Sequence, residues 1–91
     1  MLDKKTLIIN AGKIKPQVLI SYILMNKWVE ISIKRNDIKI FQYKYENDYF
    51  EQIIIPMNNE LYDFNLAMYE AIKTLAEVEK KGYRTVYIFF V

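Results

Sequence analysis

The chain of 91 residues contains no cysteine and no histidine. Without cysteine there can be no disulfides, thiolate nucleophiles or Cys-type zinc sites, which leaves the redox compartment open while slightly favouring the cytosol. Without histidine the usual general base near neutral pH and the usual nitrogen ligand of transition metals are missing. Catalysis would have to rest on Asp, Glu, Lys, Tyr or Ser, and the sequence shows no acidic cluster typical of a magnesium site. We therefore predict that the protein is not an enzyme and carries no cofactor.

Glycine and long hydrophobic runs are also scarce. Gly12 and Gly82 are the only glycines, so the glycine-rich phosphate-binding loops are excluded. No apolar run approaches the roughly 20 residues of a membrane span, and the first residues lack the apolar stretch and cleavage site of a signal peptide. We expect a soluble, cytoplasmic protein with no membrane partner.

What the chain does contain is a high hydrophobic content, 53%, spread over short runs. This composition predicts a folded chain, and the length fits a single domain spanning residues 1–91, near the size at which a partner often contributes stability. Residues 1–45 hold nine basic against three acidic residues, whereas residues 46–91 hold four against eight. Such asymmetry would suit an anionic partner or two attracting copies. Coding bias in an A/T-rich genome explains it more simply.

The hydrophobic pattern predicts an α+β fold. Pro16 suits the first turn of a helix that runs to Met25, where Asn26 would take the left-handed conformation that ends helices. Period-two alternation then predicts three strands joined by short turns, an antiparallel meander, with Val29, Ile31 and Ile33 on one face of the first strand. The strands are expected at residues 28–34, 37–45 and 49–55.

A long amphipathic helix is predicted at residues 60–81, with Asn59 as its N-cap. Its apolar stripe has spacings of three and four residues and comprises Leu61, Phe64, Met68, Ala71, Leu75 and Val78. Residues 84–91 are expected to form a C-terminal apolar strand, and residues 1–14 a short strand or an arm packed on the core.

One hairpin interleaves cations with aromatic residues. The set consists of Lys34, Arg35, Lys39, Tyr43, Lys44 and Tyr45. On a sheet face such a mixture could hold phosphates and stack bases, as in proteins that bind single-stranded RNA or DNA. The alternative, which we favour, is that Phe41, Tyr43 and Tyr45 are the core face of the meander and that the lysine stems run along it.

The C-terminal run carries no charge after Arg84 and is a candidate self-association surface. Its key residues are Val86, Ile88, Phe89 and Phe90. An exposed strand of this kind would aggregate, so it must pair inside the sheet or with another copy of the chain. Both helices can lie on one face of the sheet, which would leave the other face exposed with Trp28 or Phe41 on it and would favour a homo-oligomer.

Two further groups of residues are weaker candidates for a site. Asp37, Glu46 or Asp48 could hold a divalent ion, although turn chemistry explains these carboxylates better. A groove for a partner helix could be formed by Met57, Leu61, Phe64, Met68 and Leu75. A stripe at helical spacing is more often part of the core.

The order of elements, with Asn26-Lys27-Trp28 at the first junction, Ile40-Phe41 in the second strand and Ile54-Ile55-Pro56 ending the third, resembles known layouts. Over about residues 16–75 it is similar to the double-stranded-RNA-binding-domain-like layout of HicA-type mRNA-cleaving toxins. The resemblance would imply RNA cleavage. The catalytic histidine of that family, expected in the second strand, has no counterpart here.

The chain also resembles a set of short uncharacterised bacterial α-β-β-β-α proteins. The likeness includes Asp63-Phe64 and the segment from Ala71 to Glu79. It implies the fold and a prokaryotic origin, and no activity.

The sequence as a whole favours a non-enzymatic protein-interaction module that self-associates. The alternative is an RNA- or DNA-binding domain that uses the basic-aromatic hairpin. A toxin-type nuclease that lacks its histidine is the least favoured.

Overall fold

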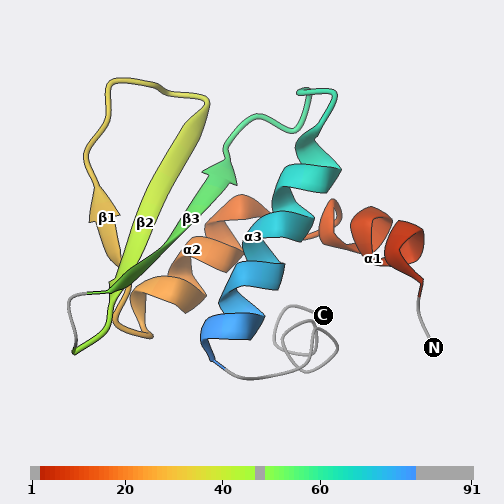
Figure 1. The fold of residues 1–91 in the computed structure, drawn as a ribbon. Helices are drawn as coiled ribbons and strands as arrows, with labels where there is room; N and C mark the ends of the chain where they lie inside the picture. The colour runs from red at the N-terminus through yellow and green to blue at the C-terminus, as the bar shows by residue number, and fades with distance from the viewer. Residues whose placement is uncertain (1–2, 47–48, 80–91) are drawn as a thin grey trace.

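The computed structural model describes residues 3–46 and 49–79. In chain order the elements are α1 (Lys4–Ala11), α2 (Pro16–Leu24), β1 (Val29–Ile31), β2 (Ile38–Lys44), β3 (Phe50–Pro56) and α3 (Phe64–Val78). The strands form one antiparallel sheet in the order β1-β2-β3, which confirms the predicted α+β fold. Figure 1 shows the helices together on one side of the sheet, with α3 between the sheet and α1. The predicted C-terminal strand, residues 84–91, lies outside the described residues.

The N-terminal segment is a helix, and the prediction of a short strand there is wrong. A carboxylate oxygen of Asp3 accepts a hydrogen bond from the Thr6 amide at 2.8 Å, which caps α1 at its start. Leu7 and Ala11, one helical turn apart, are both buried. The apolar run is too short to distinguish a helix from a strand by its period, so tertiary packing decides its structure.

The end of α2 differs from the prediction by one residue. Lys27, not Asn26, takes the left-handed conformation, with φ at 72°. The Trp28 amide donates to the Ile23 carbonyl at 3.3 Å, the pattern of a Schellman motif. The side-chain amide of Asn26 instead donates to the Tyr22 carbonyl at 2.7 Å.

The register of the strands decides which side chains face the helices. Phe41 lies opposite Ile53 and Ile40 lies opposite Ile54, and residues opposite one another share a face. Phe41, Ile53 and Ile55 are 0–1% exposed beneath the helices, which confirms Phe41 as a core residue. The expectation that Trp28 or Phe41 lies on an exposed face is therefore wrong, since Trp28 is also only 3% exposed.

The first strand is shorter than predicted. Its apolar residues, Val29 and Ile31, lie on the face of the sheet that points away from the helices. Trp28 is held in the core by the end of α2, so alternation places Glu30 on the helix side, opposite Phe41. Val29 consequently points away from the helices and is 63% exposed.

Helix α3 confirms the predicted apolar stripe but begins at Phe64, after turns in residues 59–63. Asn59 is not its N-cap, because Asp63 holds that position and the carbonyl of the Asn58 side chain accepts from the Glu60 amide. The stripe lies against β3 and α1. The residues considered as a groove are core residues or pack partly buried against it: Met57, Leu61, Phe64, Met68 and Leu75.

Candidate functional site

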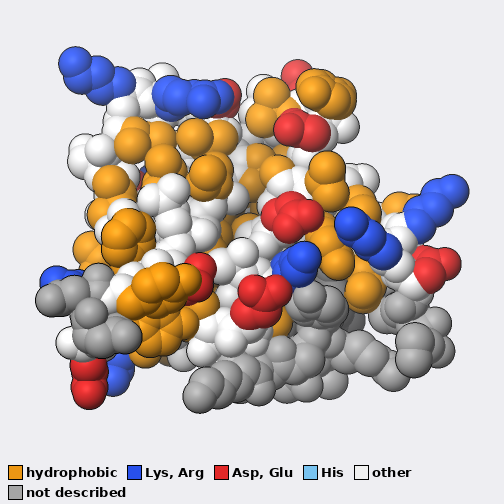
Figure 2. Space-filling model, in the orientation of Figure 1, with side chains coloured by type: hydrophobic (Ala, Val, Ile, Leu, Met, Phe, Trp, Pro, Cys, Tyr) orange, Lys and Arg blue, Asp and Glu red, His pale blue; other side chains and the backbone are white. Residues whose placement is uncertain are grey.

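The face of the sheet that points away from the helices is mostly apolar. Alternation and register assign to it Val29, Ile31, Ile38, Ile40, Gln42, Lys44, Phe50, Gln52, Ile54 and Pro56, of which Pro56, at the end of β3, is buried. We call this set the outer face. Three of its isoleucines, Ile31, Ile40 and Ile54, lie side by side across the three strands. At the left of Figure 2, over the strands of Figure 1, hydrophobic side chains gather at the surface.

Much of the outer face is in contact with solvent. Val29, Phe50 and Ile54 are 63%, 51% and 47% exposed. An antiparallel sheet with one solvated face normally alternates apolar residues inward with polar residues outward. Here the alternation is reversed at the margins, because Glu30, Lys39 and Glu51 lie on the helix side.

The polar residues of the outer face are few and have particular positions. Gln42 and Gln52 lie opposite one another, and the Gln42 side-chain nitrogen donates to the Gln52 oxygen at 3.3 Å. Lys44 is the one charged residue that β1, β2 and β3 place on this face, and it stands at the end of β2. With strands about 4.8 Å apart and about 3.3 Å per residue, the outer face covers on the order of 300 Å².

The basic residues predicted to bind nucleic acid do not form one surface. Arg35 binds Asp37 through two hydrogen bonds of 2.9 and 2.6 Å, which lower the pKa of the Asp37 carboxyl. Lys39 lies 3.5 Å from the Glu30 carboxylate. Lys34 is exposed in the same loop, and Figure 2 shows basic side chains at the upper left, where Figure 1 has the β1–β2 loop.

Tyr43, Lys44 and Tyr45, the rest of that set, lie at the opposite end of β2 from Asp37 and Lys39. Lys39 and Tyr43, the nearest members of the two groups, are four residues apart in β2, about 13 Å at about 3.3 Å each. The structure thus divides the predicted site into two parts, and Arg35 and Lys39 in the first part already have acidic partners.

Three tyrosines gather at the end of the hairpin. The ring centroids of Tyr43 and Tyr45 are 5.1 Å apart, and those of Tyr45 and Tyr49 are 5.5 Å apart. We call Tyr43, Tyr45 and Tyr49 the tyrosine cluster. The Trp28 ring continues it at 5.6 Å from Tyr43. Offset and edge-to-face contacts of this kind are favourable for aromatic rings.

Sequence reasoning missed Tyr49 as a member of this cluster. The sequence did contain an indication, because a short turn between the predicted strands at residues 37–45 and 49–55 places Tyr45 opposite Tyr49. In the structure the Tyr45 amide donates to the Tyr49 carbonyl at 2.7 Å. The Tyr49 hydroxyl donates to Glu51 at 2.9 Å, and this hydrogen bond is the main cause of the raised pKa of Tyr49. Burial is the first cause of the raised pKa of Tyr45.

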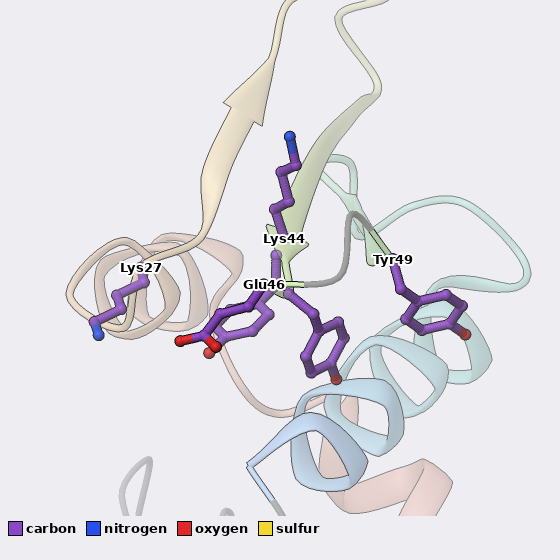
Figure 3. Close-up of a pocket in the computed structure, with 6 residues that line it drawn as sticks. Lys27, Lys44, Glu46 and Tyr49 are labelled. Carbon is purple, nitrogen blue, oxygen red and sulfur yellow. The ribbon is translucent and has the colours of Figure 1, made fainter.

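A pocket of about 620 Å³ opens beside the tyrosine cluster. Its lining consists of Lys27, Tyr43, Lys44, Tyr45, Glu46 and Tyr49. In Figure 3, Lys27 and Tyr49 lie on opposite sides of the opening with Glu46 between them, while the Lys44 side chain extends away from Glu46. Lys27 was not predicted as a site residue.

The carboxylates proposed to hold a divalent ion are not brought together. Asp37 precedes β2 and binds Arg35, Glu46 follows the other end of β2, and Asp48 lies outside the described residues. Within residues 3–46 and 49–79, no group of three Asp or Glu residues is arranged to hold a metal ion. Nor does that part of the chain contain a helix long and apolar enough to cross a membrane.

One hydrogen bond joins the ends of two helices. The Tyr22 hydroxyl of α2 donates to the Glu79 carboxylate, which follows α3, at 2.6 Å. Burial, together with this hydrogen bond, raises the pKa of Tyr22 to about 12. The contact fixes the last turn of α2 against the end of α3.

The residues predicted for self-association, Val86, Ile88, Phe89 and Phe90, lie outside the described residues. In comparisons with known proteins, no family model, no curated protein and no solved structure matches this chain.

Proposed function

We propose that this protein is a non-enzymatic interaction module that forms a homodimer through the outer face of its sheet. The observation that carries the proposal is the row of Ile31, Ile40 and Ile54, which crosses three strands without a charged neighbour in the row. An apolar face of this kind loses contact with water when it meets its own copy, and a two-fold axis brings the same residues together from both chains.

Packing of sheet on sheet provides the geometry. Two sheets that pack face to face lie about 10 Å apart with strand directions within about 30°, so Ile40 would lie near the two-fold axis. Burial of Gln42 and Gln52 is tolerable because each already has the other as a hydrogen-bonding partner. Lys44 stands at the margin and is exposed, so the contact need not bury its charge.

The area of the outer face determines how strong a dimer we expect. About 300 Å² per copy is well below the roughly 800 Å² that each partner contributes to a standard interface. At about 25 cal/mol per Å², the two faces would contribute at most about 15 kcal/mol, which is comparable with the cost of association. We propose that the apolar run at residues 85–91 contributes the remaining contact area.

The test is the solution mass of matched variants. Ile54 and Leu66 are 47% and 44% exposed, but Ile54 lies on the outer face and Leu66 lies on α3. Light scattering at high micromolar concentration should give a dimer for the wild type and for Leu66→Lys, and a monomer for Ile54→Lys. Circular dichroism checks that both variants are folded.

The C-terminal run is tested with a chain that ends at Glu79. This shorter chain should dimerise at least about tenfold more weakly if residues 80–91 contribute contact area. A monomeric wild type would refute the dimer, and a shorter chain that then dimerises would show that the C-terminal run covers the outer face of its own chain.

Binding of RNA or DNA by the whole basic-aromatic hairpin is a weaker second candidate. Arg35 and Lys39 would have to leave Asp37 and Glu30 to reach phosphates. Titration of single- and double-stranded probes at low salt tests it, and Arg35→Gln should then weaken binding.

A further inference from the structure

The pocket beside the tyrosine cluster shares only Lys44 with the outer face. Tyr43 shares the helix side of the sheet with Phe41, and the Tyr45 and Tyr49 rings continue from it. A volume of about 620 Å³ is within the range of small-molecule sites, roughly 300–1,000 Å³. A ligand in this pocket would therefore meet the proposed dimer contact only at its margin, at Lys44.

The tyrosine rings favour a planar ligand. Tyr49 is 58% exposed, whereas Tyr43 and Tyr45 are partly buried and hold their rings in mutual contact. A base that stacks on a pre-ordered ring pays little for ordering the side chain. Stacking of a nucleobase on an aromatic side chain is worth about 1–3 kcal/mol.

Of the three charged lining residues, Lys27 supplies a basic contact and Glu46 an acidic contact at the opening, whereas the Lys44 side chain extends away from Glu46. Lys27 follows α2 in a left-handed conformation that costs an L-residue roughly 1–2 kcal/mol, and glycine is the usual residue at this position of the motif. This end of α2 places the Lys27 ammonium group at the side of the pocket, where a phosphate could be bound.

Glu46 lies between Lys27 and Tyr49 across the opening. An ionised carboxylate only accepts hydrogen bonds, and it has two oxygens. Among the common bases, guanine alone presents two adjacent donors on its pairing edge, N1–H and the N2 amine. Adenine, cytosine and uracil each place an acceptor beside their donor.

We propose that this pocket binds a guanine nucleotide, with the base stacked on the tyrosine cluster, its N1–H and N2 amine bonded to Glu46, and its phosphate bound by Lys27. The same chemistry is offered by a free nucleotide and by an unpaired guanosine in a single strand. Lys44, at the rim, would contact a neighbouring phosphate only in the strand.

The experiment is an NMR titration of the ¹⁵N-labelled full chain with GMP, AMP and UMP at low salt, followed by the hexanucleotides UUGUUU and UUUUUU. We expect GMP to bind in the range of about 0.1–1 mM and at least about fivefold more tightly than AMP or UMP. If the guanosine must lie in a strand, only UUGUUU binds, with an affinity that falls with salt at a log–log slope of about −1.4 for two lysine contacts.

Matched variants separate the site from general effects. Tyr49→Ala should weaken guanine binding about tenfold, whereas Tyr62→Ala, which removes a fully exposed tyrosine elsewhere, should leave it unchanged. Glu46→Gln should remove the preference for guanine, and Lys27→Gln should weaken GMP more than guanosine. Arg35→Gln, in the β1–β2 loop, should have no effect, which distinguishes this pocket from the whole hairpin.

Several outcomes would overturn the inference. They are the absence of saturable binding of GMP and of UUGUUU up to about 10 mM, equal loss of affinity in Tyr49→Ala and Tyr62→Ala, or a guanine preference that survives Glu46→Gln. Ile54→Lys should bind GMP like the wild type, so the failure of the dimer and the failure of this site are separately visible.

Discussion

Ile53 and Ile54 are neighbours in β3 and lie on opposite faces of the sheet. Ile53 is 1% exposed beneath the helices, and Ile54 is 47% exposed on the outer face. The substitutions Ile53→Ala and Ile54→Ala remove the same three carbon atoms from the same strand. Any intrinsic strand preference therefore cancels between them to first order.

The expected losses differ by about 2 kcal/mol or more. At Ile53 the transfer of three carbons to water costs about 2.4 kcal/mol, and the cavity left beside Phe41 brings the total to about 3–4 kcal/mol. At Ile54 about half of the side chain is already in water and no closed cavity forms, so the loss is about 1 kcal/mol.

Urea denaturation at low micromolar protein concentration measures both losses. With a slope of about 1 kcal/mol per M, the two midpoints should differ by about 2 M. At high micromolar concentration the Ile54→Ala loss should grow, because the wild type then gains stability from dimerisation. Equal losses at low concentration would refute the register, and with it the assignment of the outer face.

Three further predictions concern the residues around α2. Between pH 10 and 12 the wild type should lose about 1–2 kcal/mol of stability that Tyr22→Phe does not lose, because the pKa of Tyr22 is raised to about 12 and the fold stabilises its neutral form, fully below pH 10, while solvent screens part of the effect at this partly buried hydroxyl; parallel stability curves for the two proteins would contradict this. Lys27→Gly should raise the free energy of unfolding by about 0.5–1 kcal/mol and Lys27→Ala should not, since only glycine relieves the left-handed backbone; thermal melts compare them. Trp28→Phe should cost less than about 1.5 kcal/mol although Trp28 is buried, because the indole N–H has no hydrogen-bonding partner among the described residues and its removal offsets part of the lost packing; a loss above about 3 kcal/mol in urea denaturation would argue against this.

The elements with a long or regular pattern were predictable from the sequence. The stripe of α3 recurs over four turns, and residues 37–45 alternate long enough to define β2 and to place Phe41 in the core. The turn residues between the strands and the proline at the end of β3 indicated that the three strands form an antiparallel meander. Pattern and turn chemistry agreed for these elements.

The remaining features depend on contacts that no local pattern contains. Helix α1 is a run of eight residues whose structure is decided by packing on α3, and the face of β1 is decided by the burial of Trp28. The tyrosine cluster required the hairpin register, and Lys27 required the backbone conformation at the end of α2. Arg35 and Lys39, two basic residues of the predicted nucleic-acid site, are each paired with an acidic residue that the sequence pattern did not identify as their partner.

The apolar outer face also bears on how the chain chooses its strand pairing during folding. In an ordinary sheet a slip of one residue exposes the whole apolar face, which makes the wrong pairing costly. In β3 three isoleucines follow one another, so a slipped strand would still send an isoleucine to the helices. The correct alignment is then favoured by the residues beside the isoleucines, because a slip separates Gln52 from Gln42 and moves Pro56 away from Ile38. Two glutamines on the outer face thus help to set the alignment of a strand in which three isoleucines follow one another.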